Sequence, residues 1–402
     1  MLRSTLFSAS ILLLSQASCG PAARNNCVGD ECTSGNDGGG NNHDGGGGGS
    51  CTYDPLAYDI PGDGIDNDCD GIVDNPPGPC DMGLSATSTD PGDFAKAIDI
   101  CQTSDGTTKW GLVSATYSLT TGTGTIDDAQ HYLGPNFGAG VPPKEGAALG
   151  VLASGPVRSG NGFADFYTEE ANGPAAAYPS DWYSANGNKL PNAPGCPNPS
   201  GNQAMSPIMV TLKIKVPDNI NSFTLDTNFF SSEFPEWVCS DYNDFFVELL
   251  DSTYMGTGSN ANPTDKNLAF YTPNGGATKY PVGVNLASAN AGLFTQCVNG
   301  AIGCNGTAST ISTCTGTDEL QGNGLYIDST NCLDGTNEGK AGGGTGWLQT
   351  RGNLTPGEIM TLRIAVWDTS DDALQSLAVI DNFAWDGSAA ATGTTIFIDQ
   401  NK

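Results

Sequence analysis

The sequence has few basic residues and almost no histidine. Its 402 residues include 15 Lys and Arg against 44 Asp and Glu, a formal net charge of −29. Such a surface repels phosphate backbones, which excludes nucleic-acid binding. The histidines are His43 and His131, and no Cys-x-x-Cys pair occurs, so a zinc site would have few ligands.

The motifs of common catalytic sites are also missing. The sequence contains no Gly-x-Ser-x-Gly, no phosphate-binding loop and no dinucleotide fingerprint. Because His43 lies in a Gly-rich stretch, His131 is the only base for a Ser-His-Asp triad. We therefore predict no catalytic residues, and the sequence leans against an enzyme.

Residues 1–18 have the pattern of an export signal. Arg3 precedes an apolar run from Leu6 to Leu14, and small residues follow it. The run is too short to span a bilayer, so it is a processing signal and not part of the fold.

The end of this signal resembles a bacterial lipoprotein cleavage site, at which the new N-terminal cysteine is acylated. Cys19 and Gly20 carry the resemblance, with Gln16 where that family usually has Leu. We expect Cys19 to be lipidated and to hold the protein at the outer membrane, since Gly20 is compatible with sorting there. Ordinary cleavage after Ala17, which would give a secreted protein, is the alternative.

Thirteen cysteines fit this interpretation. With Cys19 removed to lipid, 12 remain, enough for six disulfides in an oxidising compartment. We predict three close pairs, which are Cys27/Cys32, Cys80/Cys101 and Cys297/Cys304.

Composition divides the rest of the chain. Residues 19–50 are rich in Gly, Asn and Asp and form a flexible linker. Residues 51–80 hold an Asp-rich segment, 81–390 a β domain, and 391–402 a C-terminal strand or tail.

The Asp-rich segment has the spacing of a calcium loop. Counted from Asp66 as position 1 of an EF-hand loop, Asp68 and Asp70 fall at 3 and 5, the Ile72 carbonyl at 7 and Asp74 at 9. Position 12 is a proline and no helix pattern flanks the loop, so it is not an EF-hand. An acidic, solvated loop without a metal is the alternative.

The run Asp-Gly-Ile-Asp-Asn-Asp-Cys-Asp-Gly in this segment resembles the short motif of MopE-type bacterial surface proteins and, more loosely, thrombospondin type 3 repeats. The resemblance implies cation binding outside the cell. We predict Ca²⁺ bound by Asp66, Asp68, Asp70, Ile72 and Asp74.

Beyond residue 80 the dominant apolar period is two. Alternating apolar residues predict strands over 210–216, 223–229, 360–366 and 377–385, with Leu377, Val379, Asp381, Phe383 and Trp385 on one face. Asp90 and Pro91 predict the start of one short helix whose buried face extends to Cys101. The expected fold is mainly β, an antiparallel jelly-roll-like sandwich with long disulfide-linked loops.

Two blocks resemble the choice-of-anchor L domain of bacterial surface proteins, namely residues 226–247 with Ser-Ser-Glu-Phe-Pro-Glu-Trp and 376–386 with Ile-Asp-Asn-Phe. The resemblance implies a jelly-roll-like module without an established enzymatic role, found beside varied anchors. Here the N-terminal lipid would be the anchor.

Acidic residues crowd the turn in the first block. A second metal site there would use Glu233, Glu236, Asp241, Asn243 and Asp244, with Asp381 from the last strand. Ordinary turn hydrogen bonding and a glycosidase-like carboxylate pair are the alternatives. Residues 367–372 are expected to form a solvated turn, and Trp182, Tyr183 and Trp237 to be either core or sugar-stacking residues.

The sequence thus predicts a cell-surface lipoprotein that presents a calcium-stabilised sandwich with an adhesive or structural role. Its partners would be the membrane, through the lipid, and a surface polysaccharide or protein. An exported carbohydrate-binding or carbohydrate-active protein that uses the loop from Glu233 to Asp244 is the alternative.

Overall fold

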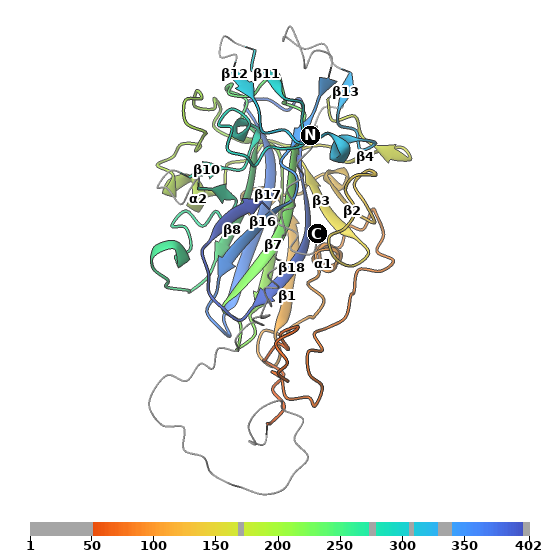
Figure 1. Ribbon diagram of the computed structural model, residues 1–402, viewed down its shortest axis with the longest axis vertical. Helices are drawn as coiled ribbons and strands as arrows, with labels where there is room; N and C mark the ends of the chain where they lie inside the picture. Colours follow the sequence, from red (N-terminus) through yellow and green to blue (C-terminus); the bar gives the residue numbers. More distant parts are fainter. Residues whose placement is uncertain (1–50, 168–172, 273–278, 305–308, 329–339, 397–402) are drawn as a thin grey trace, which may run out of the picture. The chain divides into compact units, whose positions relative to one another are not determined.

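A computed structural model describes residues 51–167, 173–272, 279–304, 309–328 and 340–396 (Figure 1). The predicted signal peptide, the lipidated Cys19, the linker and the Cys27/Cys32 pair lie outside these residues. Within the described part, no helix has the length and apolar character needed to cross a bilayer.

Two antiparallel sheets form the domain, which confirms the predicted β-sandwich. The first contains, in spatial order, β1 (Gly111–Ser118), β6 (Ala204–Lys215), β17 (Ile359–Thr369) and β8 (Phe245–Asp251). The second contains β19 (Gly393–Ile396), β16 (Leu348–Asn353), β7 (Ser222–Ser231), β18 (Ser376–Asp386), β3 (Leu149–Ala153) and β2 (His131–Gly134), with β15 (Gly343–Gly344) also pairing with β7.

Successive long strands alternate between the sheets. The chain passes from β6 to β7 to β8, and later from β16 to β17 to β18, changing sheet each time. As a result β17 lies between β6 and β8, and β7 lies between β16 and β18. This crossing order is that of a jelly-roll-like sandwich.

Short elements complete the described chain. They are the helices α1 (Pro91–Ala97) and α2 (Ser180–Ala185), and the hairpins β4 (Arg158–Ser159) with β5 (Gly162–Phe163), β9 (Phe270–Tyr271) with β10 (Tyr280–Pro281), β11 (Gly300–Ile302) with β12 (Ser309–Ile311), and β13 (Ile327–Asp328) with β14 (Lys340–Ala341).

The core between the sheets is built from the predicted alternation. Val210, Leu212 and Ile214 of β6 are fully buried, whereas Lys213 between them is exposed. They pack in one cluster with Phe223 and Leu225 of β7. Burial of such a side chain contributes about 1.5–3 kcal/mol, so the period of two fixes which face turns inward.

The outer faces of both sheets are covered as well. Trp182 of α2 packs with Phe245 of β8 and Trp367 of β17 outside the first sheet. Phe137 and Phe166 pack on the outside of the second sheet. Every residue of β7 is therefore buried, and the long connections form covering layers and not a second domain core.

Strand β18 differs from its predicted face pattern. Leu377 and Val379 face the outer cluster, whereas Phe383 lies in the central core. The register with β7 shifts between Asp381 and Ala384, and Asn382 has φ 54°. This bulge inserts a residue and reverses the side-chain alternation, so the prediction of one shared face is wrong.

Helix α1 begins as predicted and ends earlier. The Asp90 side chain accepts a hydrogen bond from the Gly92 N–H at 2.8 Å, as an N-cap does. The helix stops at Ala97, and Asp99 has φ 69°, so Cys101 lies beyond it and not on its buried face. Phe94, Ala97 and Ile98 nevertheless share the core.

Four disulfides join described cysteines, which are Cys51–Cys69, Cys80–Cys101, Cys196–Cys239 and Cys297–Cys314. The predicted Cys80/Cys101 pair is confirmed. The predicted Cys297/Cys304 pair is wrong, because Cys297 bonds Cys314 instead; Cys304 is also disulfide-bonded.

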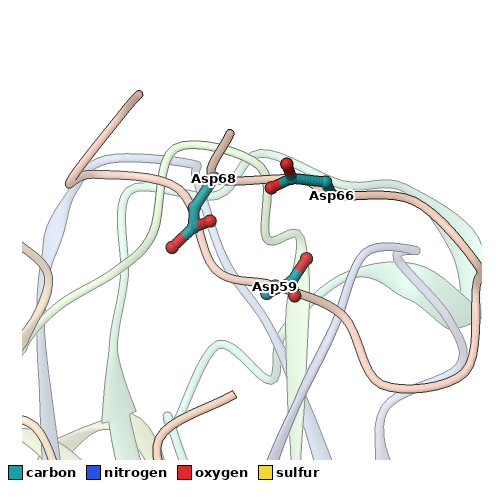
Figure 2. Close-up of side chains that lie close together, drawn as sticks. All are labelled: Asp59, Asp66 and Asp68. Carbon is teal, nitrogen blue, oxygen red and sulfur yellow. The ribbon is translucent and has the colours of Figure 1, made fainter. Parts of the chain in front are cut away.

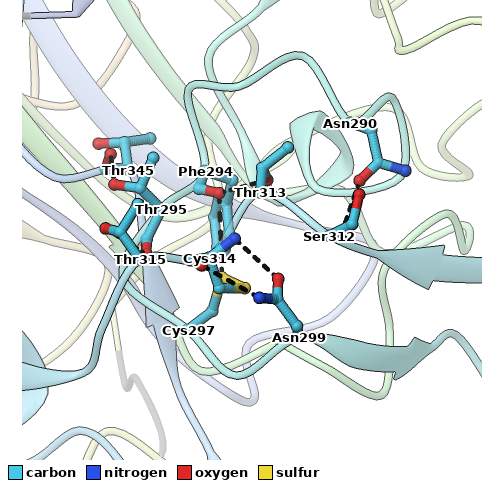
Figure 3. Close-up of a disulfide and its surroundings, with 10 residues drawn as sticks. All are labelled: Asn290, Phe294, Thr295, Cys297, Asn299, Ser312, Thr313, Cys314, Thr315 and Thr345. Atoms are coloured by element: carbon cyan, nitrogen blue, oxygen red, sulfur yellow. Dashed lines mark hydrogen bonds between the residues drawn. A yellow bond between two sulfur atoms is a disulfide. The ribbon is translucent and has the colours of Figure 1, made fainter. Parts of the chain in front are cut away.

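Side-chain hydrogen bonds surround the Cys297–Cys314 disulfide (Figure 3). The Asn299 side chain donates to the Cys314 carbonyl at 3.1 Å and accepts from its N–H at 2.9 Å. Thr313 donates to the carbonyl of Phe294 at 2.8 Å. The disulfide thus closes a small satellite core that contains Phe234, Phe294 and Ile302.

Replacing both Cys297 and Cys314 by Ala should lower the free energy of unfolding by about 3 kcal/mol, as expected for a loop of this size. The sequence separation is 17 residues. Urea unfolding of the variant and of the parent measures the difference. An unchanged midpoint would show that the disulfide adds nothing to the satellite core.

Candidate metal site

Three aspartates converge in the segment 51–80. Carboxylate oxygens of Asp59, Asp66 and Asp68 all lie within 4.8 Å of one another (Figure 2). Oxygens that share a Ca²⁺ ion at 2.3–2.6 Å are separated by at most about 5 Å, so this spacing fits calcium. Among the described residues, this is the one group of three acidic, His or Cys side chains with such spacing.

Backbone N–H groups fix these carboxylates. Asp59 accepts from the N–H of Asn67 at 2.8 Å and from the N–H of Asn75 at 2.5 Å. Asp66 accepts from the N–H groups of Asp70 and Gly71 at 3.1 and 2.9 Å. Asp59 thereby ties both ends of the loop together, and Gly71, with φ 96°, makes the turn.

An oxygen without a partner lies in the same region. The Oδ1 atom of Asn75 is buried and has no hydrogen-bond donor among the described groups. Asn75 lines a cavity of about 290 Å³ together with Asp59, Asp68 and Asp70. A bound cation would give this amide oxygen the partner that buried polar atoms require.

No counter-charge balances the segment from within. Residues 51–80 contain seven Asp and no Lys, Arg or His, and the ion pairs between described residues include none of these aspartates. Asp59 and Asp66 are only 3% and 8% exposed. Burial and then the neighbouring Asp70, Asp59 and Asp66 charges raise the pKa of Asp68, against a hydrogen bond from Asp70. A divalent cation would relieve this repulsion.

The sandwich holds the segment in place. The Trp110 indole donates to the Ala57 carbonyl at 2.8 Å, and its ring meets Tyr58 edge-on at 5.3 Å. The side chain of Asn219 accepts from the N–H of Tyr58 at 2.9 Å and donates to its carbonyl at 2.8 Å. The Cys51–Cys69 disulfide closes the segment itself.

The predicted ligands are thus brought together in part. Asp66 and Asp68 belong to the convergent group, and Asp70 lines the adjoining cavity. Asp74 instead accepts from the N–H of Gly64 at 3.2 Å, and the Ile72 carbonyl stays a predicted ligand. Sequence reasoning missed Asp59 and Asn75, because EF-hand counting begins at Asp66 and assigns no ligand to position 10, where Asn75 falls.

Most acidic residues of the second predicted site are buried. Glu233, Glu236 and Asp244 are 2%, 4% and 1% exposed, whereas Asp241 is at the surface. In the described part of the chain these three carboxylates are closed to solvent, so a sugar could not reach a pair formed by them. Asn243 accepts from the N–H of Asn285 at 3.1 Å, a contact between segments 42 residues apart and not a local turn hydrogen bond.

Glu233, Asp244 and a further carboxylate, Asp368, form a cluster of buried acidic residues. Asp368, in the stretch expected to be a solvated turn, is fully buried, and so is its neighbour Trp367, so the prediction is wrong for 367–369; the bend lies at 370–372, where Asp372 is exposed. The strand β17 simply continues through them to Thr369 and is covered by α2. Neither oxygen of Asp368 has a donor in bonding geometry among the described groups.

Burial dominates the titration of the cluster. It raises the pKa of Asp244 to about 8, although Ser376 and the Thr369 N–H donate to this carboxylate at 2.6 and 3.1 Å. Burial and then the charge of Asp244 raise the pKa of both Glu233 and Asp368. Protons can therefore neutralise this cluster, and a metal ion there stays a prediction.

Asp381 lies elsewhere. It is five residues along β18 from Ser376, which bonds Asp244, a distance of roughly 16 Å along a strand. Its carboxylate accepts from the N–H of Lys144 at 2.5 Å, and burial raises its pKa to about 8. The structure therefore does not bring Asp381 to the other five residues.

The other candidate side chains belong to the interior. His131 is 3% exposed and stacks on Tyr117 with ring centroids 4.5 Å apart, and burial lowers its pKa. Neither ring nitrogen has a hydrogen-bond partner among the described groups. Trp182 is fully buried, so it is a core residue and not a sugar-stacking one; Tyr183 and Trp237 are half-buried.

No family model, curated protein or solved structure matches the chain. The resemblances to MopE-type motifs and to choice-of-anchor L domains therefore stay predictions. The function must be argued from the site itself.

Proposed function

We propose that this protein is an exported, lipid-anchored cell-surface protein whose Asp-rich segment binds Ca²⁺ and is thereby held against a disulfide-linked β-sandwich. The sandwich would have an adhesive or structural role. The observation that carries the proposal is the convergence of Asp59, Asp66 and Asp68 beside the unpartnered oxygen of Asn75.

Several features support the cellular location. Disulfides persist in oxidising compartments, and at least four join described cysteines. The lipid anchor at Cys19 would come first in the mature chain, followed by the linker and then by the calcium segment. The site would then face the extracellular medium, which contains calcium, and not the reducing, calcium-poor cytosol.

Chelation should loosen the segment 51–80. A ligand present at a hundred times its Kd stabilises the unit it holds by about 2.7 kcal/mol. With EGTA, we expect protease cleavage within 51–80 and a lower melting temperature, both reversed by added Ca²⁺. Limited proteolysis with mass spectrometry and a thermal scan of the mature protein measure these effects.

Two matched variants make this test specific. Asp59→Asn removes a member of the convergent group and should make the protein insensitive to EGTA. Asp63→Asn removes an exposed aspartate of the same segment outside that group and should keep the full response. Equal cleavage and melting with and without EGTA in the parent would refute the calcium role.

The carbohydrate-active alternative receives less support. Glu233, Glu236 and Asp244 are closed to solvent, and a general acid or nucleophile must touch its substrate.

Intact mass spectrometry of the membrane-extracted protein tests the lipid anchor, because an acylated Cys19 adds the mass of its acyl chains to a chain that begins at residue 19.

A further inference from the structure

A cavity beside the edge strand β19 differs in charge from the chain as a whole. It has a volume of about 460 Å³, and the described residues that line it include Lys279 and Arg351 but no Asp or Glu. The complete chain has almost three acidic residues for each basic one. A cavity with positive charge in so acidic a protein selects an anionic ligand by charge complementarity.

Three strands build the cavity. β19 pairs with β16, so that Thr395 lies beside Gln349 and Gly393 beside Arg351. β9 closes another side with Phe270 and Tyr271. A Cβ atom at Gly393 would lie 2.9 Å from the Phe270 ring, so glycine is what lets β9 approach this closely. Half of the wall is thus a packed sheet edge, and residues between strands, Lys279 among them, complete it.

The two cations are positioned by different means. The Lys279 ammonium lies 4.1 Å from the centroid of the Phe270 ring, and the residue is exposed. Arg351 contacts Asp386 at 2.6 Å and Ser222 at 3.3 Å, both through Nη1. Within the described part, Nε and Nη2 of Arg351 remain available, and a guanidinium binds a carboxylate best with two such N–H groups.

A second cavity of similar size shows what is distinctive here. It measures about 430 Å³ and is lined by Lys213 and Arg363. There Arg363 contacts both Asp181 and Asp251, at 2.6 and 3.2 Å, so two carboxylates offset its charge. Lys266 also pairs with these two carboxylates, so net charge does not separate the two cavities. They differ in that Arg363 uses both Nη atoms on Asp181 and Asp251, whereas Arg351 bonds through Nη1 alone.

We propose that the cavity beside β19 binds a carboxylated saccharide. Arg351 and Lys279 would hold the carboxylate, Tyr271 offers a half-buried ring face, and Gln349 and Thr395 offer polar groups to sugar hydroxyls. Its volume lies within the roughly 300–1,000 Å³ of ligand sites. The inference supplies a ligand for the adhesive role proposed above, yet the site shares no residue with the calcium segment and stands if that segment binds no metal.

Calorimetry with a glucuronic acid trisaccharide tests this site on the mature protein at fixed calcium. The methyl-esterified trisaccharide keeps the shape and removes the charge, and it should bind at least tenfold more weakly. Inorganic sulfate should bind more weakly than the trisaccharide. Equal binding of the ester, equally tight sulfate binding, or no binding of the trisaccharide at millimolar concentration would each overturn the proposal.

Variants locate the binding. Lys279→Gln changes an exposed residue and should weaken trisaccharide binding at least tenfold without loss of stability; Arg351→Gln should do the same, with folding checked by circular dichroism. Lys213→Gln, in the second cavity, is the matched control and should bind like the parent. Binding that survives Lys279→Gln, or that is lost in Lys213→Gln, would overturn the assignment.

Discussion

The free energy of unfolding should fall as pH rises from 6.5 to 8, in the presence of chelator. The pKa of Asp244 and of Asp381 is raised to about 8 from an ordinary value of 3.8. In this range the unfolded chain has lost both protons while the folded chain still holds most of them, so folding takes up protons. The stabilisation is complete below the unfolded pKa and lost through pH 8, by about 3 kcal/mol for the two groups between pH 6.5 and 8.

Urea unfolding at several pH values measures this slope, and Asp368→Asn tests its origin. An uncharged amide at the buried Asp368 removes a carboxyl whose own pKa is raised by burial, together with one source of the raised pKa of Glu233, so the variant should be more stable than the parent at pH 8 and have a shallower slope. Asp372→Asn changes an exposed aspartate nearby and should keep the parent's slope. A parent that gains stability with pH, or an unchanged slope in Asp368→Asn, would contradict the role of the cluster.

The sequence predicts the buried face of a strand correctly where the other face is polar. Val210, Leu212 and Ile214 alternate with polar residues, and the structure buries all three. The alternation predicts the wrong face for part of β18, because the bulge at Asn382 reverses it and no residue type in the sequence indicates a bulge there. Backbone conformation at a single residue thus decides which face Phe383 joins.

Acidic residues misled sequence reasoning in a different way. Charged side chains are normally exposed, so the sequence predicts a solvated turn at Asp368. The structure instead buries this residue fully. Its neighbours include Asp244 and Ser154, which lie more than 120 and more than 200 positions earlier in the chain. Burial of this kind depends on distant segments, and no local pattern reports it.

The candidate metal site was half predicted for a related reason. Alternating Asp66, Asp68 and Asp70 form a local pattern, and two of the three belong to the convergent group. Asp59 joins them only because its carboxylate accepts hydrogen bonds from residues 8 and 16 positions later. Likewise the pair Cys80/Cys101 follows from proximity in sequence, whereas Cys196–Cys239 depends on the tertiary fold.

Trp110→Ala should release the Asp-rich segment from the sandwich. Trp110 is 7% exposed, donates to Ala57, packs on Tyr58 and lines the cavity with Asp59 and Asp68. Truncation of a buried tryptophan costs about 3–5 kcal/mol. We expect rapid protease cleavage within 51–80 even with calcium, while the sandwich keeps its fold. Trp110→Phe keeps an aromatic ring but loses the N–H donor and part of the indole, so it should release the segment less than Trp110→Ala does.

The variant also tests whether docking and metal binding are one event. If calcium binds only the docked segment, Trp110→Ala raises the apparent Kd by the factor by which the docked population falls. EGTA should then add little cleavage to that of Trp110→Ala, because the segment is already released. Trp237→Ala, a half-buried tryptophan that packs on Tyr242 instead, is the control and should keep the EGTA response. Fully additive effects of Trp110→Ala and EGTA would mean that calcium orders the segment independently of its contact with the sandwich.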